Sequence, residues 1–193
     1  GQIAANAETP GPTKDKLTAR FSDTAKNLYK LYIAFTLVQT ILLCLGGMSV
    51  YDAFLHAFGT IGTGGFSNYN DSVGHFNAYM QIVILVFMVL AGTNFNLFFV
   101  LKRRGIRTFL QDEELRFYLI VMGAASLAVF ACNQLNTHFK NTAGSLLDSA
   151  FQVVSIMTTT GYATADYDLW PTFSKMVLLC LFFFGGSSSS TSG

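Results

Sequence analysis

Two short turns rich in threonine and glycine contain the residues in this sequence whose types suggest a specific chemistry. The eight residues are Thr63, Gly64, Gly65, Phe66, Thr159, Thr160, Gly161 and Tyr162. A cation that leaves water needs replacement oxygen ligands, and rows of backbone carbonyls supply them, sometimes together with threonine hydroxyls. Glycine adopts at little cost the backbone conformations that point successive carbonyls to one side. The two turns therefore predict sites that coordinate a dehydrated cation.

The two turns belong to an internal repeat. A shift of 96 positions places Thr63 on Thr159 and Gly65 on Gly161, and self-similarity at a fixed period indicates repeated structural units. The same shift pairs Ser49 with Ser145, Asp52 with Asp148, and Met80 with Met176. A lone Thr-Gly-Gly is an ordinary loop, and a lone Ser/Asp pair is an ordinary helix cap. Their joint recurrence at one spacing favours a shared function.

The hydropathy of the two units agrees with the repeat. Each unit has a long apolar span, a shorter amphiphilic segment, the turn, an outer loop and a second apolar span. We expect the first spans at residues 31–47 and 117–135, the short segments at 51–61 and 147–157, and the second spans at 78–101 and from 172 onward.

The short segments cannot cross a bilayer. About 11 residues of helix rise roughly 16 Å, which is about half of the hydrocarbon thickness. Ser49 with Asp52, and Ser145 with Asp148, form the capping arrangement that starts a helix. A half-membrane helix followed by irregular backbone is stable only when it is buried in protein or lines water. The segments therefore predict re-entrant pore loops, in which the negative end of each helix faces the turn and favours a cation.

Composition places the chain in a membrane. Only 12% of the residues are charged and 51% are hydrophobic, whereas a soluble domain has about 25% charged residues. Residues 31–51, 72–101 and 117–139 contain no charged side chain, and a helical span needs about 20 apolar residues. The alternative, a soluble protein with buried helices, rarely has three such runs. We predict an all-α integral membrane protein.

The basic residues indicate the orientation. Ten of the twelve lie before the first span or between the second and third spans, and they are Lys14, Lys16, Arg20, Lys26, Lys30, Lys102, Arg103, Arg104, Arg107 and Arg116. By the positive-inside rule this side is cytoplasmic. The net charge of +1 gives no reason to expect a nucleic-acid partner.

The turns also resemble those of a known family. Residues 63–67 and 158–167 resemble the filter motifs of the Trk/Ktr/HKT superfamily of potassium transporters, and within it the membrane subunit of bacterial Trk systems. The resemblance implies a cation channel-like fold of four tandem helix–pore loop–helix repeats around a pseudo-fourfold pore, of which these are the second and third. It also implies that Gly65 and Gly161 are filter glycines whose presence goes with selectivity for the potassium ion.

The resemblance further implies a domain organisation and partners. The expected parts are a cytoplasmic lead-in at residues 1–27, a first repeat at 28–101, a cytoplasmic linker at 102–114, and a second repeat at 115–193, truncated in its last helix. The expected partners are membrane lipid, the remaining two pore-loop repeats of a longer chain, a second full subunit in a homodimer, and a cytoplasmic nucleotide-binding regulatory subunit. The expected location is the bacterial inner membrane, crossed several times.

The small polar tail is expected to be a gate below the filter, on the basis of the same resemblance. Its residues are Gly185, Gly186, Ser187, Ser188, Ser189, Ser190, Thr191, Ser192 and Gly193. The repeat shift places the break at residues 91–94 on residues 187–190, which supports this interpretation modestly. Without the family, the same composition also fits an engineered Gly/Ser linker.

The predicted function is transmembrane transport of potassium, passive or coupled to another ion, without enzymatic activity. Two alternatives remain: a sodium-permeable or sodium-coupled relative, and the ion-binding subunit of an ATP-driven potassium pump. His56 is expected to pack or to form local hydrogen bonds. Asp166 and Asp168 fit either an outer mouth that attracts cations or a solvated loop.

Overall fold

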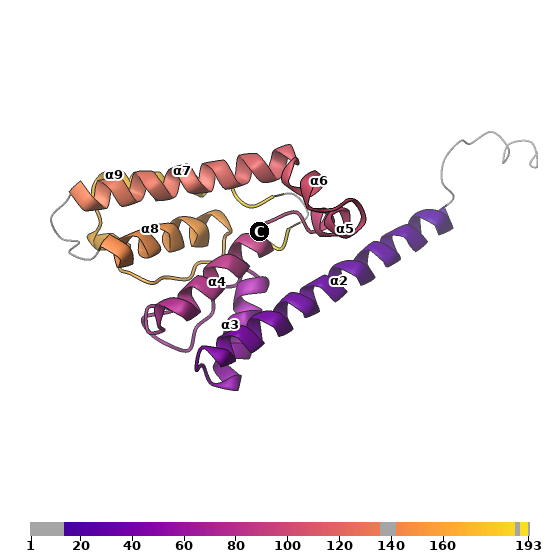
Figure 1. The fold of residues 1–193 in the computed structure, drawn as a ribbon, viewed down its shortest axis with the longest axis horizontal. Coiled ribbons are helices and arrows are strands. Elements are labelled where there is room, and N and C mark those ends of the chain that lie inside the picture. The colour runs from indigo at the N-terminus through magenta and orange to yellow at the C-terminus, as the bar shows by residue number, and fades with distance from the viewer. Residues whose placement is uncertain (1–13, 136–141, 188–189, 193) are drawn as a thin grey trace, which may run out of the picture. The chain divides into compact units, whose positions relative to one another are not determined.

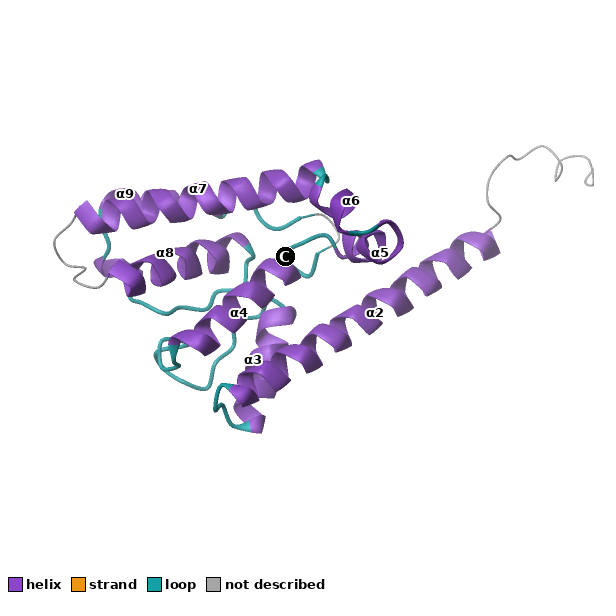
Figure 2. Cartoon of the chain, viewed as in Figure 1, coloured by secondary structure: helices purple, strands orange, loops and turns teal. Residues whose placement is uncertain are grey.

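The computed structural model describes residues 14–135, 142–187 and 190–192. Every regular element in this part of the chain is a helix (Figure 2), which confirms the all-α prediction. The chain divides within the first helix, α2 (Lys14–Leu45), into a unit of residues 1–34 and a unit of residues 35–193. The described part of the first unit is the beginning of α2. All other elements belong to the second unit.

The first pore helix, α3 (Val50–Ile61), lies where the sequence predicts a short helix. Ser49 is its N-cap, because the Ser49 hydroxyl oxygen accepts a hydrogen bond from the Asp52 N–H at 3.1 Å. The same hydroxyl donates to the Asp52 carboxylate at 2.8 Å. The carboxylate also favours the positive end of the helix dipole. Gly62 ends the helix, and the turn begins at the next residue.

The predicted span at residues 78–101 is not one continuous helix. It consists of α4 (Ala78–Ala91) and α5 (Phe95–Arg104), which are bent by 91° relative to each other. Asn94 starts α5 by accepting a hydrogen bond from the Asn96 N–H at 2.9 Å. The break expected at residues 91–94 is therefore a sharp corner, at which a new capped helix begins.

The second repeat follows two short connecting elements. Helix α6 (Ile106–Leu110) leads to α7 (Glu113–Leu135), which packs against the second pore helix, α8 (Thr142–Met157). A 3-10 turn, η1 (Tyr167–Leu169), precedes α9 (Thr172–Leu181), which packs against both α7 and α8. Figure 1 shows α7 and α8 side by side, with α4 next to α8.

The prediction that Ser145 caps the second pore helix is wrong. Helix α8 begins at Thr142, so Ser145 lies inside its first turn. The side chain of Asp148 instead accepts a hydrogen bond from the Thr164 hydroxyl at 2.9 Å, in the outer loop. The paired Ser and Asp of the repeat therefore mark the start of a helix only in the first repeat.

Polar side chains join the three helices of the second repeat. Asn133 of α7 is fully buried, and its amide oxygen accepts a hydrogen bond from the Ser174 hydroxyl of α9 at 2.8 Å. Its amide nitrogen donates to the Ser149 hydroxyl of α8 at 3.4 Å. Such bonds between helices are typical of membrane bundles, where small and polar residues replace the hydrophobic effect as the source of association.

Two helices of the described residues are long and apolar enough to cross a membrane, residues 25–45 and α7, or three if the bent pair α4 and α5 counts as one span. Large apolar side chains on outward faces are exposed, as Ile41 (58%), Ile120 (64%) and Leu127 (63%) illustrate. In water such surfaces would be unfavourable, whereas lipid hydrocarbon covers them. The membrane prediction is confirmed by these helices together with the relatives described below.

Candidate functional site: paired turns at the ends of the pore helices

The first turn is held by the last residues of α3. The carbonyl oxygen of Gly59 accepts hydrogen bonds from the N–H groups of Gly64 at 2.8 Å and Gly65 at 3.1 Å. These two bonds fold the chain back on the end of the helix. The N–H groups of the turn consequently face the helix, and they are not available to an ion pathway.

The second turn has the same geometry. The carbonyl oxygen of Ser155 in α8 accepts hydrogen bonds from the N–H groups of Thr160 at 2.9 Å and Gly161 at 3.2 Å. The three residues involved are those that the shift of 96 positions predicts from Gly59, Gly64 and Gly65. The internal repeat seen in the sequence is therefore also a repeat of backbone hydrogen bonding.

Both turns alternate in backbone handedness. Thr63 (φ 48°) and Gly65 (φ 63°) have positive φ in the first turn, and Thr159 (φ 57°) and Gly161 (φ 87°) have positive φ in the second. A positive φ is unusual for a β-branched residue such as threonine. Strained backbone of this kind is concentrated at functional sites. Its presence at equivalent threonines in both repeats indicates a shared requirement for the turn conformation.

The carbonyl oxygens of the turns are the polar groups left over. Within the described part of the chain, no donor bonds the carbonyl oxygen of Gly64, Gly65, Thr160 or Gly161. Gly64 and Gly161 are exposed and Gly65 is half-buried, so most of these oxygens are accessible to a ligand. A dehydrated cation is the partner that such oxygens suit.

The two turns lie against each other. A side chain built on Gly65 would collide with the carbonyl oxygen of Thr160, so the backbones approach as closely as glycine allows. On the outer side, the N–H of Val73 donates to the carbonyl oxygen of Ala163 at 3.0 Å. Turns separated by 96 residues are therefore in direct backbone contact.

The aromatic residues that follow Gly65 and Gly161 differ in their surroundings. Tyr162 is buried (1% exposed), and its ring stacks on that of His56 at 5.9 Å between centroids. Its hydroxyl lies 3.2 Å from the carbonyl oxygens of both His56 and Phe66. Phe66, in contrast, is 76% exposed and borders an open apolar groove along α3.

The repeat-related acids Asp52 and Asp148 tie their helices to the outer loops, a role that the sequence analysis missed. The Asp52 carboxylate accepts hydrogen bonds from the Asn68 amide at 2.7 Å and the Tyr69 hydroxyl at 3.2 Å. Asp148 accepts the equivalent bond from Thr164, at the position that the repeat shift pairs with Asn68. The signal was present in the sequence as a polar residue at both positions.

Replacing Asp52 with alanine should lower the melting temperature of the complete polypeptide by several degrees, because three side-chain hydrogen bonds are lost together. Bonds from Ser49 and Asn68 lower the pKa of the Asp52 carboxyl, so its contribution to stability is present near neutral pH and is lost as the pH falls through that lowered pKa. Thermal unfolding in detergent at pH 7 measures the effect. Asp71→Ala, at a solvent-exposed loop acid (59% exposed), is the matched control. An equal loss in both variants would contradict the assigned role.

His56 packs as predicted. It is fully buried, its Nδ1 lies 2.8 Å from the Asp52 carbonyl oxygen, and its Nε2 lies 3.1 Å from the Ser67 hydroxyl. A carbonyl accepts only, so Nδ1 carries the proton. The imidazole therefore connects α3 to the residue that follows the filter turn.

The tail after α9 lies beneath the first turn. The Thr191 N–H and hydroxyl both donate to the carbonyl oxygen of Ala91, at 3.2 and 3.1 Å, and the Ser187 N–H donates to that of Gly92 at 2.9 Å. The Thr63 hydroxyl lies 2.9 Å from the carbonyl oxygens of both Thr191 and Gly62, which share its one proton. If α4 continued, the carbonyl oxygens of Ala91 and Gly92 would accept hydrogen bonds within the helix. Here they accept hydrogen bonds from the tail instead.

Some of the predicted gate residues lie outside the described part of the chain, namely Ser188, Ser189 and Gly193. The described ones are Gly185, Gly186, Ser187, Ser190, Thr191 and Ser192. Within this set, the Ser190 hydroxyl donates to the carbonyl oxygen of Ser187 at 2.6 Å. The described residues of the tail are compact and internally bonded, and they attach to the corner between α4 and α5.

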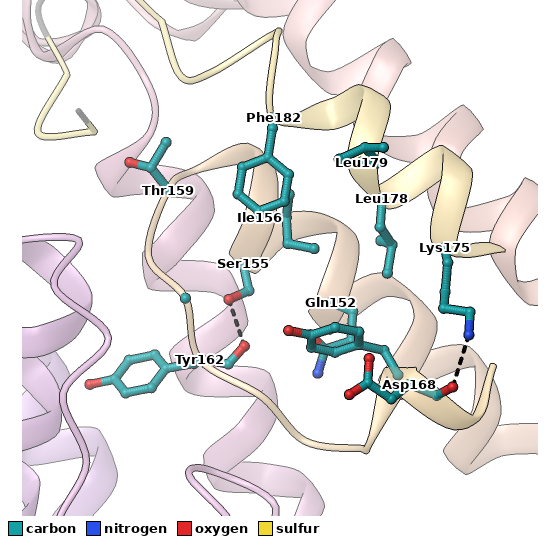
Figure 3. Close-up of a pocket in the computed structure, with 12 residues that line it drawn as sticks. Gln152, Ser155, Ile156, Thr159, Tyr162, Asp168, Lys175, Leu178, Leu179 and Phe182 are labelled. Atoms are coloured by element: carbon teal, nitrogen blue, oxygen red, sulfur yellow. Dashed lines mark hydrogen bonds between the residues drawn. The ribbon is translucent and has the colours of Figure 1, made fainter. Parts of the chain in front are cut away.

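A groove of about 440 Å³ runs along the exposed side of the second turn (Figure 3). Ser155, Thr159 and Tyr162 line one wall, and Leu178 of α9 and Phe182, the residue after that helix, line another. Of the two acids proposed for the outer mouth, Asp168 lines this groove, and the bonds in this loop use the side chain of Asp166 but only the backbone of Asp168. The Asp166 carboxylate accepts a hydrogen bond from the Asp168 N–H at 3.0 Å, and the Lys175 ammonium donates to the Asp168 carbonyl oxygen at 3.0 Å.

Comparison with known proteins identifies the family. The model of the TrkH family, described as cation transport protein, matches residues 4–193. The chain belongs to the TrkH family. The family consists of transport proteins, in agreement with the prediction that the chain is not an enzyme. TrkH-family proteins cross the bacterial inner membrane several times, which confirms the predicted location.

The individual relatives are named as Trk potassium uptake or transport proteins. The chain is 37% identical, over 97% of its length, to the "Trk system potassium uptake protein TrkH" of Escherichia coli strain K12. It is also 37% identical, over 97% of its length, to TrkG of that strain, and 34% identical, over its full length (100%), to TrkH of Halomonas elongata. The crystal structure of the potassium transporter TrkH from Vibrio parahaemolyticus matches 96% of the chain with a TM-score of 0.86 and 30% identity.

The chain corresponds to only part of each TrkH-family relative. It spans 39% of the Escherichia coli TrkH and TrkG sequences and 40% of the Halomonas elongata TrkH sequence. It likewise spans 39% of the chain in the Vibrio parahaemolyticus structure. Whatever the complete relatives transport and assemble with therefore depends also on sequence outside this region.

Proposed function

We propose that this chain forms two repeats of a potassium transport pathway, and that carbonyl oxygens of residues 63–66 and 159–162 replace the water of the permeating ion. The observation that supports this most is the pair of turns with alternating positive φ, whose N–H groups bond to the pore helices and whose backbones meet at Gly65. The names of the relatives support potassium as the transported ion.

The organisation that we propose is the one expected from the sequence. Residues 28–101 and 115–193 are the second and third of four repeats around a pseudo-fourfold axis, residues 1–27 are a cytoplasmic lead-in, and residues 102–114 are a cytoplasmic linker. The open groove beside Phe66 and the open side of Gly161 are the faces on which further repeats would pack, since the equivalent faces between the two repeats are buried.

The proposed gate is the tail at residues 185–193. The bond from the Thr63 hydroxyl to the Thr191 carbonyl oxygen supports this role, because it joins the tail to the inner end of the filter. An ion that leaves the first turn toward the cytoplasm would meet the tail. Movement of the tail away from α4 would therefore open the pathway.

The proposed partners belong to the complete polypeptide. We propose a homodimer of that polypeptide and a cytoplasmic nucleotide-binding regulatory subunit. The cluster of basic residues between the two repeats is on the side where such a subunit would bind, and charge complementarity would guide the encounter.

Uptake by cells tests the function. A strain that lacks its own potassium uptake systems should grow at low potassium when it expresses the complete polypeptide, and it should accumulate potassium and rubidium in preference to sodium. The measurement is ion content over time, with an empty vector as control. Accumulation of sodium in preference would favour the sodium-permeable alternative, and no accumulation of any of the three ions would refute the proposal.

A further inference from the structure

The two pore helices differ at the residue that holds the filter turn. Gly59 of α3 and Ser155 of α8 occupy equivalent positions, and the carbonyl oxygen of each accepts the two N–H bonds of its turn. The backbone role is therefore the same in both repeats. The side chains are not, because only the second repeat has a hydroxyl at this position.

In the second repeat, the serine hydroxyl has a partner in its own turn. The Ser155 hydroxyl donates to the carbonyl oxygen of Tyr162 at 2.6 Å, and Figure 3 shows this bond at the wall of the groove. Ser155 is fully buried. The bond fixes the peptide plane between Tyr162 and Ala163, one residue beyond Gly161.

In the first repeat, the equivalent carbonyl receives its hydroxyl from the other repeat. The Tyr162 hydroxyl lies 3.2 Å from the carbonyl oxygen of Phe66, the residue equivalent to Tyr162. A side chain built on Gly59 would collide with this hydroxyl, so the tyrosine occupies the space that a serine would fill. In the first repeat, the Tyr162 hydroxyl thus takes the place of the serine hydroxyl that position 59 lacks.

The second contact of the tyrosine does not explain its position. Its hydroxyl also lies 3.2 Å from the carbonyl oxygen of His56. That carbonyl already accepts a hydrogen bond from the Thr60 hydroxyl at 2.6 Å. A phenol has one proton to donate, and Phe66 is where no other described donor is available.

We propose that Gly59 and Tyr162 are a coupled pair of positioning residues, which supply across the repeat boundary the hydroxyl that Ser155 supplies within its own repeat. The carbonyl of the residue after each filter glycine, Phe66 or Tyr162, is thereby held by a hydroxyl in both repeats. This inference rests on the proposed function for its effect on transport. Its geometric part, the exchange of one hydroxyl for another, does not depend on which ion passes.

The exchange can be tested by giving the first repeat the serine that the second repeat has and removing the Tyr162 hydroxyl. Four variants of the complete polypeptide are needed: Tyr162→Phe, Gly59→Ser, the double variant Gly59→Ser/Tyr162→Phe, and the control Gly59→Ala/Tyr162→Phe. The control fills the same space without a hydroxyl. Each is measured for the potassium concentration that gives half-maximal uptake, for the ratio of potassium to sodium uptake, and for the melting temperature in detergent.

Tyr162→Phe should raise the half-maximal potassium concentration about threefold to tenfold, the equivalent of one lost hydrogen bond. Gly59→Ser alone should be worse, because its side chain collides with the phenol. The double variant with serine should return to within about twofold of the parent, whereas the alanine control should remain as impaired as Tyr162→Phe. Restoration by serine and not by alanine is a result that space filling alone does not produce.

Equal behaviour of the serine and alanine double variants, in uptake and in melting temperature, would overturn the inference. Failure of the parent to take up potassium would instead refute the proposed function. The inference would then be decided by the melting temperatures alone, where serine should restore the loss caused by Tyr162→Phe and alanine should not.

Discussion

Replacing Gly65 with alanine is expected to reduce potassium uptake by the complete polypeptide about a hundredfold. Gly65 has a φ of 63°, which costs an alanine about 1–2 kcal/mol. The added methyl group also meets the backbone carbonyl of Thr160, which cannot rotate away as a side chain could, and overpacking of this kind costs about 1–3 kcal/mol. The sum, about 3 kcal/mol, corresponds to roughly a hundredfold change in rate.

Gly105→Ala is the matched control for this variant. Gly105 has a φ of 82° and a ψ of 174° between α5 and α6, a conformation used mainly by glycine that costs alanine about 1–3 kcal/mol. Nothing in the described structure lies within 4 Å of a methyl group built there. The cost falls on the link between α5 and α6 and not on the contact between the turns, so uptake should stay within about tenfold of the parent. Similar loss in both variants would show that backbone strain explains the effect and that the contact between the turns does not matter.

Gly161→Ala extends this prediction to the proposed ring of repeats. Gly161 has a φ of 87°, and its side-chain direction is open among the described residues. If a further repeat packs there as the turn of the second repeat packs on Gly65, alanine should be as damaging as at Gly65. A loss no greater than that of Gly105→Ala would contradict the pseudo-fourfold arrangement.

Serine in place of Gly65 or Gly161 should in addition weaken the preference for potassium over sodium.

Local signals in the sequence predicted the parts of the fold that depend on neighbouring residues. Ser49 and Asp52 marked the start of α3 to within a residue, since capping needs only the first turn of a helix. The threonines and glycines marked both turns, because a positive φ limits which residues are suitable. The internal repeat supported the prediction of the turns, because the same residue types recur 96 positions later.

Features that depend on distant partners were not predictable in this way. At the 91° corner after α4, the carbonyl oxygens of Ala91 and Gly92 accept hydrogen bonds from Thr191 and Ser187 respectively, about a hundred residues away. The early start of α8 at Thr142 likewise contradicted a cap that the sequence repeated faithfully. Local sequence patterns limit the backbone conformations that a segment can adopt. Contacts with distant residues determine which of those conformations the folded protein has.

The candidate site shows the same division. The eight turn residues are brought together as two adjacent turns, but sequence alone gave Phe66 and Tyr162 the same role. Tyr162 is buried between the two repeats, whereas Phe66 is 76% exposed. Equivalent residues in a repeat have equivalent surroundings only where both have a neighbouring repeat, and in the described residues only Tyr162 has one.

Loosening the tail from α4 is expected to increase potassium flux, with the effect graded over three substitutions at Thr191. Thr191→Ser keeps both donors to the Ala91 carbonyl oxygen and should behave like the parent. Thr191→Val keeps only the N–H, and Thr191→Pro keeps neither, because proline lacks the N–H. Each lost bond shifts the balance between bound and released tail by about 0.5–1.5 kcal/mol.

The expected series is therefore serine, valine and proline in order of rising flux, with roughly a 5- to 100-fold increase for proline. Rubidium flux into proteoliposomes of the complete polypeptide measures it, without a regulatory subunit present. Hydrogen exchange of residues 185–192 should rise in the same order, which separates release of the tail from a change in the filter. Flux that falls along the series while exchange rises would mean that the attached tail supports the filter, through its bond to Thr63, and does not block the pathway.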